Sequence, residues 1–363
     1  MDTRIKKLVD YMEHQSVDVL LITQPKNVYY FTGFLTDPHE RFMGLVLIKG
    51  EDPFLFLPLL DAGNAETVSS VRKIYSHDDA ENAYEVLQRY LPSNISTLGL
   101  EKNHLTVKSY EAVVGIAKAG EIHEIDELLQ EMRVSKSQDE IAKIKKAIQI
   151  TEEALRLTIP KIKLDVTEME VVAELEYQIK RLGTQGPSFS SIVLAGEKAG
   201  HPHGHPGDRK IKTGEFLLLD FGVILDGYVS DLSRTFAIGE INDQLKDIYD
   251  TVLQANLQAI ESVRPGEPIA NVDLSARAVI ENRGYGQYFI NRVGHGFGME
   301  IHEHPSVHSK AEGLLREGMT FTIEPGIYNP KLTGVRIEDN VVVTKDGVNV
   351  LSTFPKELQT LDL

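Results

Sequence analysis

The segment GEFLLLDFGVILDGYVSDLSRTF, residues 214–236, contains two apolar stretches on either side of Asp226-Gly227. An Asp-Gly pair between such stretches is the strongest short-range signal of a β-hairpin, because both residues tolerate the positive φ that the turn requires. We therefore expect residues 225 and 228 to pair across a tight turn. The hairpin predicts an antiparallel sheet in the second half of the chain.

Two aspartates of this hairpin are predicted to share one face. The pairing places Asp231 opposite Gly222, and Asp220 is then its diagonal neighbour, about 7–8 Å away. Asp220 directly follows the apolar run FLLL, where a charge needs a partner. The alternative is that one Asp ends a strand and the other caps a turn. Two inward carboxylates repel each other unless a cation lies between them, so the arrangement favours a metal site.

Histidines also gather in this half of the chain, and one of them has unusual neighbours. In RVGHGFGMEIHEHP, residues 292–305, the glycines around His295 allow a backbone to approach closely. His302 follows seven residues after His295. The segment is typical of a ligand or catalytic histidine in a tight cleft, although a lone histidine more often belongs to a core or a surface.

A third segment, MTFTIEPGIYNPKLTGVRIEDNVVV (319–343), contains two glutamates that each follow a short apolar strand. These are Glu324 after TFTI and Glu338 after GVRI, and the residues between them can return the chain antiparallel. Ordinary solvation at a strand end is the alternative for each. Asp220 is the third carboxylate that directly follows an apolar strand, and solvation at a strand end explains three such cases less well than one.

Together the three segments supply four carboxylates and one imidazole: Asp220, Asp231, His295, Glu324 and Glu338. This oxygen-rich set suits manganese, and also cobalt or zinc, better than copper or an iron–sulfur cluster. Four carboxylates exceed the need of one ion. Two divalent ions bridged by carboxylates and a hydroxide would balance them and supply a nucleophile at neutral pH.

Composition agrees with this interpretation and excludes several alternatives. The 363 residues include 54 acids, 38 bases and no cysteine, which gives a formal net charge of −16. The absence of cysteine excludes disulfides, thiolate metal sites and thiol nucleophiles. The acidic balance disfavours nucleic acid as a partner. The chain has no apolar signal core and no long apolar run, so we expect a cytoplasmic protein without a membrane segment.

The length and the pattern of elements predict two domains. Helices and strands alternate over residues 1–130, which indicates an α/β domain, and none of its strands is followed by a glycine-rich phosphate loop. Residues 131–363 combine long helices with antiparallel-looking strands, an α+β pattern. Ser135 or Ser137 is expected to cap a long helix near this boundary.

At the five candidate ligands the sequence resembles the pita-bread metallopeptidases, which include Xaa-Pro dipeptidase (prolidase), aminopeptidase P and methionine aminopeptidase. The resemblance rests on DFGVILDGYVSD, GHGFG, IEPGIY and GVRIED. It implies a catalytic pita-bread domain over 131–363 in which those five residues bind two divalent metal ions, manganese or cobalt most often. The segment ITQPKNVYYFTGF (22–34) is similar to the creatinase/prolidase N-terminal domain, which implies that residues 1–130 cap the cleft in a homodimer.

The resemblance also assigns residues on the substrate side. His203 matches one substrate-side histidine of the family and His302 the second, and both would stabilise the oxyanion or help to protonate the leaving proline nitrogen. Glu324 would be both a metal ligand and a proton shuttle. Arg336 matches the arginine beside the last metal ligand, where it would orient its neighbours or bind the substrate carboxylate, with a plain salt bridge as the alternative.

The sequence departs from the prolidase pattern at two positions. Asn291 stands where a histidine is common, and Phe297 where a smaller aliphatic residue is common. Asn291 lies four residues before His295, so we expect it to approach the substrate pocket. An amide cannot take up a proton as an imidazole does, and this position therefore bears on substrate preference.

The activity implied by the resemblance is metal-dependent hydrolysis of the Xaa-Pro bond in dipeptides or short peptides by a metal-bridging hydroxide. Two alternatives stay open. One is a creatinase-like amidinohydrolase, which works without metal, and the other is a non-catalytic pita-bread module that binds proteins. Retention of all five candidate ligands argues against both.

Overall fold

The structure is a computed structural model that describes residues 3–363. Contacts divide the chain into two compact units, Met1–Met132 and Arg133–Leu363. This division and the boundary predicted at residue 130 both fall within helix α6 (Asp126–Val134). No helix in the described part of the chain is long and apolar enough to cross a membrane.

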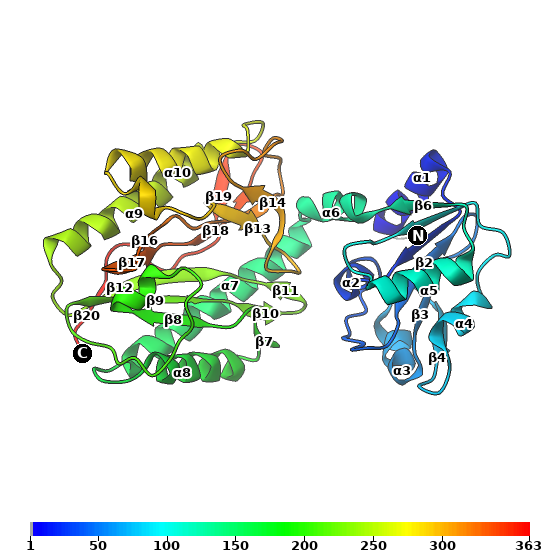
Figure 1. Ribbon diagram of the computed structural model, residues 1–363, viewed down its shortest axis with the longest axis horizontal. Helices are drawn as coiled ribbons and strands as arrows, with labels where there is room; N and C mark the ends of the chain where they lie inside the picture. The colour runs from blue at the N-terminus through cyan, green and yellow to red at the C-terminus, as the bar shows by residue number, and fades with distance from the viewer. Residues whose placement is uncertain (1–2) are drawn as a thin grey trace. The chain divides into compact units, whose positions relative to one another are not determined.

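The N-terminal unit is built on a six-stranded mixed sheet in the order β4-β3-β2-β1-β5-β6 (Figure 1). The strands are β1 (Val19–Ile22), β2 (Gly44–Ile48), β3 (Phe54–Pro58), β4 (Lys73–His77), β5 (Thr97–Leu100) and β6 (Glu121–Glu124). The helices are α1 (Thr3–Gln15), α2 (Pro25–Thr32), α3 (Leu59–Val68), α4 (Ala83–Gln88) and α5 (Val107–Ala117). The predicted α/β architecture is confirmed.

The C-terminal unit combines long helices with mainly antiparallel strands. Its helices are α7 (Gln138–Thr158), α8 (Glu168–Arg181), α9 (Asp243–Ser262) and α10 (Ala270–Asn282), with the short 3-10 helices η1 (Ile159–Lys161), η2 (Gly196–Gly200) and η3 (Gly286–Tyr288). Ser137 caps α7 in a capping box with Glu140, which resolves the two predicted candidates. In Figure 1, α9 and α10 lie on one side of the strands of this unit and α8 on the other.

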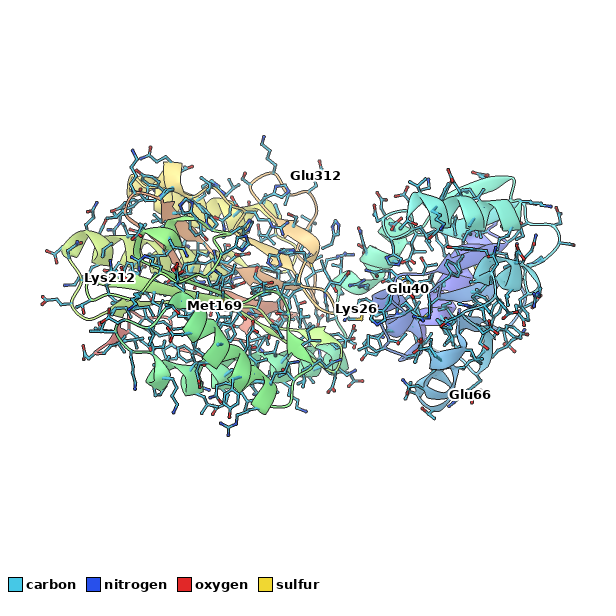
Figure 2. The ribbon with its side chains drawn as sticks, turned by 60° about the horizontal axis from the view of Figure 1, so that its bottom comes forward. Lys26, Glu40, Glu66, Met169, Lys212 and Glu312 are labelled. Carbon is cyan, nitrogen blue, oxygen red and sulfur yellow. The ribbon has the colours of Figure 1, made fainter. Side chains whose placement is uncertain are left out.

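The strands of the C-terminal unit fall into four small sheets. In chain order they are β7 (Gly186–Pro187), β8 (Ile192–Ala195), β9 (Glu215–Phe221), β10 (Val223–Leu225), β11 (Tyr228–Val229), β12 (Leu232–Ile238), β13 (Gly294–Gly296), β14 (Glu303–Val307), β15 (Thr320–Ile323), β16 (Gly326–Asn329), β17 (Thr333–Arg336), β18 (Asp339–Val343), β19 (Val348–Val350) and β20 (Thr360–Leu361). Exposed charged side chains such as Glu66, Lys212 and Glu312 surround each unit (Figure 2).

The predicted hairpin is confirmed, with its register. Leu225 pairs with Tyr228 across a turn in which Asp226 and Gly227 have φ of 49° and 76°. The same register continues from β10–β11 into β9–β12, where Asp220 pairs with Ser233. One local turn therefore fixes the placement of residues six or more positions away from it along each strand.

A second pair of strands is equally regular. β15 pairs with β18 so that Ile323 lies opposite Asp339, and β16 pairs with β17 so that Gly326 lies opposite Arg336. The register is the same in both ladders. Glu324 and Glu338 are therefore opposite one another in the short interval between the two ladders.

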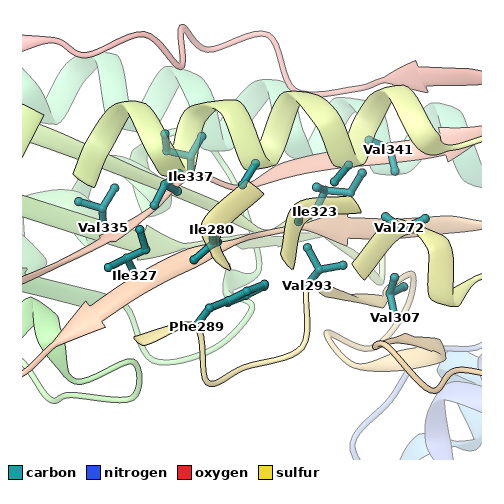
Figure 3. Close-up of a cluster of buried hydrophobic side chains, with 14 of the residues drawn as sticks. Val272, Ile280, Phe289, Val293, Val307, Ile323, Ile327, Val335, Ile337 and Val341 are labelled. Carbon is teal, nitrogen blue, oxygen red and sulfur yellow. The ribbon is translucent and has the colours of Figure 1, made fainter. Parts of the chain in front are cut away.

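Two hydrophobic cores hold these strands in place. The larger core lies between α9, α10 and strands that include β15–β18, and Figure 3 shows Val272 and Ile280 of α10 within it. The second core packs α7 and α8 against β8, β9 and β12. Along β9, Leu217 and Leu219 belong to this second core, and the two-residue period of a strand turns Asp220 to the opposite face.

Candidate metal centre

The eight predicted metal-binding and catalytic residues all line one cavity of about 420 Å³: His203, Asp220, Asp231, His295, His302, Glu324, Arg336 and Glu338. The remaining walls are largely apolar and include Phe189, Ile192, Pro202, Ile301 and Tyr328. The cavity lies wholly within the C-terminal unit. Residues that are up to 135 positions apart in the sequence, from His203 to Glu338, thus meet at one site.

His295 lies at the centre of the acidic cluster. Its Nε2 is 3.3 Å from Glu324 Oε1 and 3.6 Å from Asp231 Oδ2. Its Nδ1 is 3.2 Å from the carbonyl oxygen of Gly296, which can only accept, so the Nδ1–H donates to that oxygen and Nε2 is directed at the carboxylates. Asp231, His295 and Glu338 each offer one ligand atom, and all three atoms lie within 4.8 Å of one another.

Asp220 and Glu338 are joined by a buried polar network. Arg336 donates from Nη2 to Asp220 Oδ2 and from Nε to Ser233 Oγ at 2.8 Å, and Ser233 Oγ donates to Glu338 Oε2 at 2.8 Å. Arg336 also donates from Nη1 to Tyr328 Oη at 3.0 Å. All three nitrogens of the Arg336 guanidinium therefore donate hydrogen bonds. These bonds fix the orientation of Asp220 directly and that of Glu338 through Ser233.

The electrostatics of the cluster are those of carboxylates that lack sufficient positive charge. Burial, followed by repulsion from the neighbouring acids, raises the pKa of Asp231 and of Glu338 well above their usual range. Burial also raises the pKa of Asp220, although the charge of Arg336 opposes it. Burial acts to raise the pKa of Glu324 as well, but the hydrogen bond and charge of His295 outweigh it, and the pKa is lowered.

The residues present fit a divalent metal centre. Asp220 Oδ1 and Glu338 Oε1 are buried without a hydrogen-bond partner, which is costly for carboxylate oxygens unless a cation completes their surroundings. The partnered oxygens of the same two carboxylates are held by Arg336 and Ser233. Each carboxylate is therefore oriented through one oxygen and presents the other, as metal ligands with supporting hydrogen bonds do.

His302 and His203 lie on the cavity wall outside the carboxylate cluster. The His302 ring meets the His295 ring edge to face, with centroids 4.3 Å apart. Burial and the neighbouring charges of His295 and Arg292 lower the pKa of His302 to about 4, so its imidazole is neutral at pH 7. His203 is exposed on the loop that follows η2.

A buried ion cluster holds the turn that precedes His302. Glu303 Oε1 accepts the backbone N–H groups of Met299 and Glu300 at 2.9 and 3.0 Å. The same carboxylate contacts Arg133 and accepts from Lys136 Nζ at 3.0 Å. Burial acts to raise the pKa of Glu303, but the charges of Lys136 and Arg133 outweigh it and lower the pKa to about 2.

The two departures from the prolidase pattern have different surroundings. Asn291 lines the cavity, as expected, and its Nδ2 donates to the carbonyl oxygen of Glu324 at 3.5 Å while its Oδ1 has no partner. Phe297 is fully buried, and its carbonyl oxygen accepts from Thr320 Oγ1 at 2.7 Å. Asn291 is therefore placed to contact a bound molecule, whereas Phe297 belongs to the core.

Some residues of the site were not predicted. Ser233 bridges Arg336 and Glu338, and Thr322 Oγ1 lies 3.3 Å from Glu324 Oε1. For Thr322 the signal is present in the sequence, because a residue two positions before Glu324 in a strand shares its face. For Ser233 the signal is its pairing with Asp220 in the predicted hairpin register.

Two known protein family models match this chain, one over each of its two units. The model of metallopeptidase family M24 matches residues 142–345, and the model of the creatinase/prolidase N-terminal domain matches residues 4–135. The chain belongs to metallopeptidase family M24, which implies divalent metal ions, and it carries the two-domain, pita-bread architecture of the prolidase type.

Individual relatives are similar over their whole length. A Bacillus subtilis protein named "Putative dipeptidase YkvY" is 42% identical over 358 residues, which cover 98% of this chain and 99% of the relative. The prolidase from Pyrococcus horikoshii OT3 superposes with a TM-score of 0.92 at 36% identity, covering 98% of this chain and 100% of that one. The Xaa-Pro dipeptidase from Bacillus anthracis gives 0.93 at 33% identity, covering 99% of each chain. The chain is therefore a hydrolase of the Xaa-Pro dipeptidase-like kind.

Proposed function

We propose that the protein hydrolyses the Xaa-Pro peptide bond of dipeptides or short peptides, with two divalent metal ions in the C-terminal cavity. The observation that carries the proposal is that four carboxylates and the Nε2 of His295 line one cavity. Two of the carboxylate oxygens, Asp220 Oδ1 and Glu338 Oε1, are buried without a hydrogen-bond partner. The likeness to solved proteins described as prolidase and Xaa-Pro dipeptidase supports the choice of substrate. Manganese is the proposed metal, with cobalt and zinc as alternatives.

In this proposal the ions would be held by Asp220, Asp231, His295, Glu324 and Glu338. Bound divalent ions supply a hydroxide nucleophile at neutral pH by lowering the pKa of water. Glu324 accepts the proton of the attacking water and passes it to the proline nitrogen as the C–N bond breaks.

The two cavity histidines act on the substrate. His302 is neutral at pH 7 because its pKa is about 4, so it donates one N–H to the carbonyl oxygen on which negative charge develops. His203, on the exposed loop, hydrogen-bonds the substrate from another side of the cavity. Arg336 keeps Asp220 and, through Ser233, Glu338 in place. The apolar wall that includes Ile192 receives the ring of the proline.

The test combines metal analysis with a substrate panel. The protein is stripped with a chelator, reloaded separately with manganese, cobalt or zinc, and assayed on Xaa-Pro dipeptides, longer Xaa-Pro peptides and reversed Pro-Xaa dipeptides. We expect two equivalents of metal per chain and cleavage of the Xaa-Pro substrates only. Less than one equivalent, with no metal-dependent cleavage of any Xaa-Pro bond, contradicts the proposal and favours the metal-free or non-catalytic alternative.

A matched pair of variants tests the ligand assignment. Asp231→Asn removes a carboxylate from the cavity, and we expect activity to fall by about 10²-fold or more while the fold is retained. Asp226→Asn makes the same change at the exposed turn of the same hairpin, where Asn tolerates a positive φ equally well. The control is expected to keep full activity. Normal activity in Asp231→Asn refutes the assignment.

The proposal extends to the assembly and the cellular setting. We propose a homodimer in the cytoplasm, in which residues 1–130 cap the catalytic domain of residues 131–363 so that only short peptides enter. Multi-angle light scattering of the purified chain measures the assembly directly. Equal cleavage of short and long peptides contradicts the capping role.

A further inference from the structure

Glu168 is fully buried at the start of α8, and its carboxylate binds three groups far along the chain. The Ala195 N–H donates to Oε1 at 2.9 Å, the Gly207 N–H donates to Oε2 at 3.0 Å, and Lys198 Nζ donates to Oε2 at 2.5 Å. Ala195 ends β8 and Gly207 lies 39 residues after Glu168. One carboxylate thus joins the two ends of the loop 196–206, which carries His203.

Glu168 is not needed to cap its own helix. Thr167 and Glu170 form a complete capping box at the N-terminus of α8, so the helix end is already satisfied. Glu170 is exposed, and Met169, labelled in Figure 2, is 50% exposed. Burying a carboxylate costs free energy unless its oxygens are hydrogen-bonded, so the burial of Glu168 must be matched by what it binds.

The first part of the loop that Glu168 closes also packs against the β16–β17 hairpin. A Cβ atom on Gly334 of β17 would lie 1.8 Å from the carbonyl oxygen of Ala199, and one on Gly200 would lie 2.5 Å from that of Asn329. The backbones of η2 and of the β16–β17 hairpin are therefore in close contact. With both ends joined and one face packed, the remaining freedom of the loop is small, and His203 faces the cavity from it.

We infer that Glu168, together with Lys198, is a positioning residue for His203. It touches neither the cavity nor a candidate metal ligand, and it acts by fixing the base of the loop that presents the imidazole. The inference rests on the proposed function, in which His203 contacts the substrate. A displacement of about 1 Å at such a group lowers the rate by up to about 10²-fold.

The test compares Glu168→Gln with Glu170→Gln, the same substitution two residues along the same helix. Gln has one acceptor oxygen, so its NH2 group would face either the Ala195 N–H or both Lys198 Nζ and the Gly207 N–H, and it cannot accept from them. We expect Glu168→Gln to lower kcat by about 10- to 100-fold with KM changed less than about 2-fold. Glu170→Gln keeps the one acceptor oxygen that completes the capping box, so we expect it to change thermal stability little and to leave kcat unchanged.

A double-mutant cycle separates positioning from general destabilisation. In a His203→Ala background, Glu168→Gln is expected to lower kcat by less than about 2-fold, because its effect passes through the missing imidazole. An undiminished 10- to 100-fold loss in that background overturns the inference.

A second readout requires no activity. In protein labelled with 13C at the histidine Cε1, the His203 signal is identified by its absence in His203→Ala. It is expected to shift or broaden in Glu168→Gln and in the milder Lys198→Met, but not in Glu170→Gln. An unchanged His203 signal in Lys198→Met overturns the inference even if Glu168→Gln does not fold. Absence of peptidase activity in the unmodified protein, with these shifts present, contradicts only the proposed function.

Discussion

Glu303→Gln provides the most direct test of the ion cluster formed by Glu303, Lys136 and Arg133 beside the candidate metal centre. The side chains of Glu303, Lys136 and Arg133 are only 6%, 2% and 8% exposed. The pKa of Glu303 falls from an ordinary 4.5 to about 2 on folding. At 1.36 kcal/mol for each pKa unit, the folded protein favours the charged form by about 3 kcal/mol. Gln keeps the shape and an acceptor for the two backbone N–H groups, so the substitution removes the charge together with the oxygen that accepts from Lys136.

The sign of this contribution defines its pH dependence. A carboxylate whose pKa is lowered by folding stabilises the protein fully above its unfolded pKa, and this stabilisation is lost as the pH falls through the folded pKa. We expect Glu303→Gln to lower the free energy of unfolding by about 3 kcal/mol at pH 7, and by roughly half of that at pH 3. Urea unfolding followed by circular dichroism measures both values.

The control for Glu303→Gln is Glu312→Gln, which changes an exposed glutamate of the same unit. We expect its effect on the free energy of unfolding to lie within about 0.5 kcal/mol at every pH. The reasoning is refuted if Glu303→Gln is equally mild at pH 7. It is refuted also if the loss at pH 3 is as large as at pH 7, because the charge would then not be its cause.

Two further substitutions test the supports of the cavity. Arg336→Lys retains the charge, but a lysine cannot contact Asp220, Ser233 and Tyr328 at once. We therefore expect the metal affinity, measured by calorimetric titration, to fall by about 10- to 100-fold. An unchanged affinity contradicts the positioning role of Arg336. Gly334→Ala forces a Cβ against the backbone of η2 and is expected to cost about 2 kcal/mol or more in thermal unfolding. Gly347→Ala, whose Cβ would meet nothing within 4 Å, is the control, and equal melting temperatures for the two would contradict the close packing.

Local signals account for much of what could be predicted. The Asp226-Gly227 turn sets a register, and a constant two-residue period carries that register to Asp220 and Asp231. The placement of Glu324 opposite Glu338 follows in the same way from one antiparallel return. Ser137, one of the two predicted caps, marks the start of α7. Each of these inferences needs only neighbours along one or two strands or one helical turn.

Other features depend on contacts that a sequence pattern does not contain. β13 brings His295 beside β15 through a single long-range pairing, Gly296 with Phe321, and no local signal specifies that partner. Glu168 and Glu303 are two among 54 acidic residues, and nothing in their flanking residues marks them as buried.

The register of the first hairpin also has an evolutionary consequence. The turn at Asp226-Gly227 is the far end of a ladder whose other part carries Asp220 and Asp231. Residues inserted at the tip lengthen the connection without moving any pair below it, whereas one residue inserted within β12 turns every later side chain to the opposite face. Insertions and deletions in this hairpin are therefore expected at the turn rather than within its strands. For the same reason, the turn is the position in the hairpin at which to insert an affinity tag or a new recognition loop.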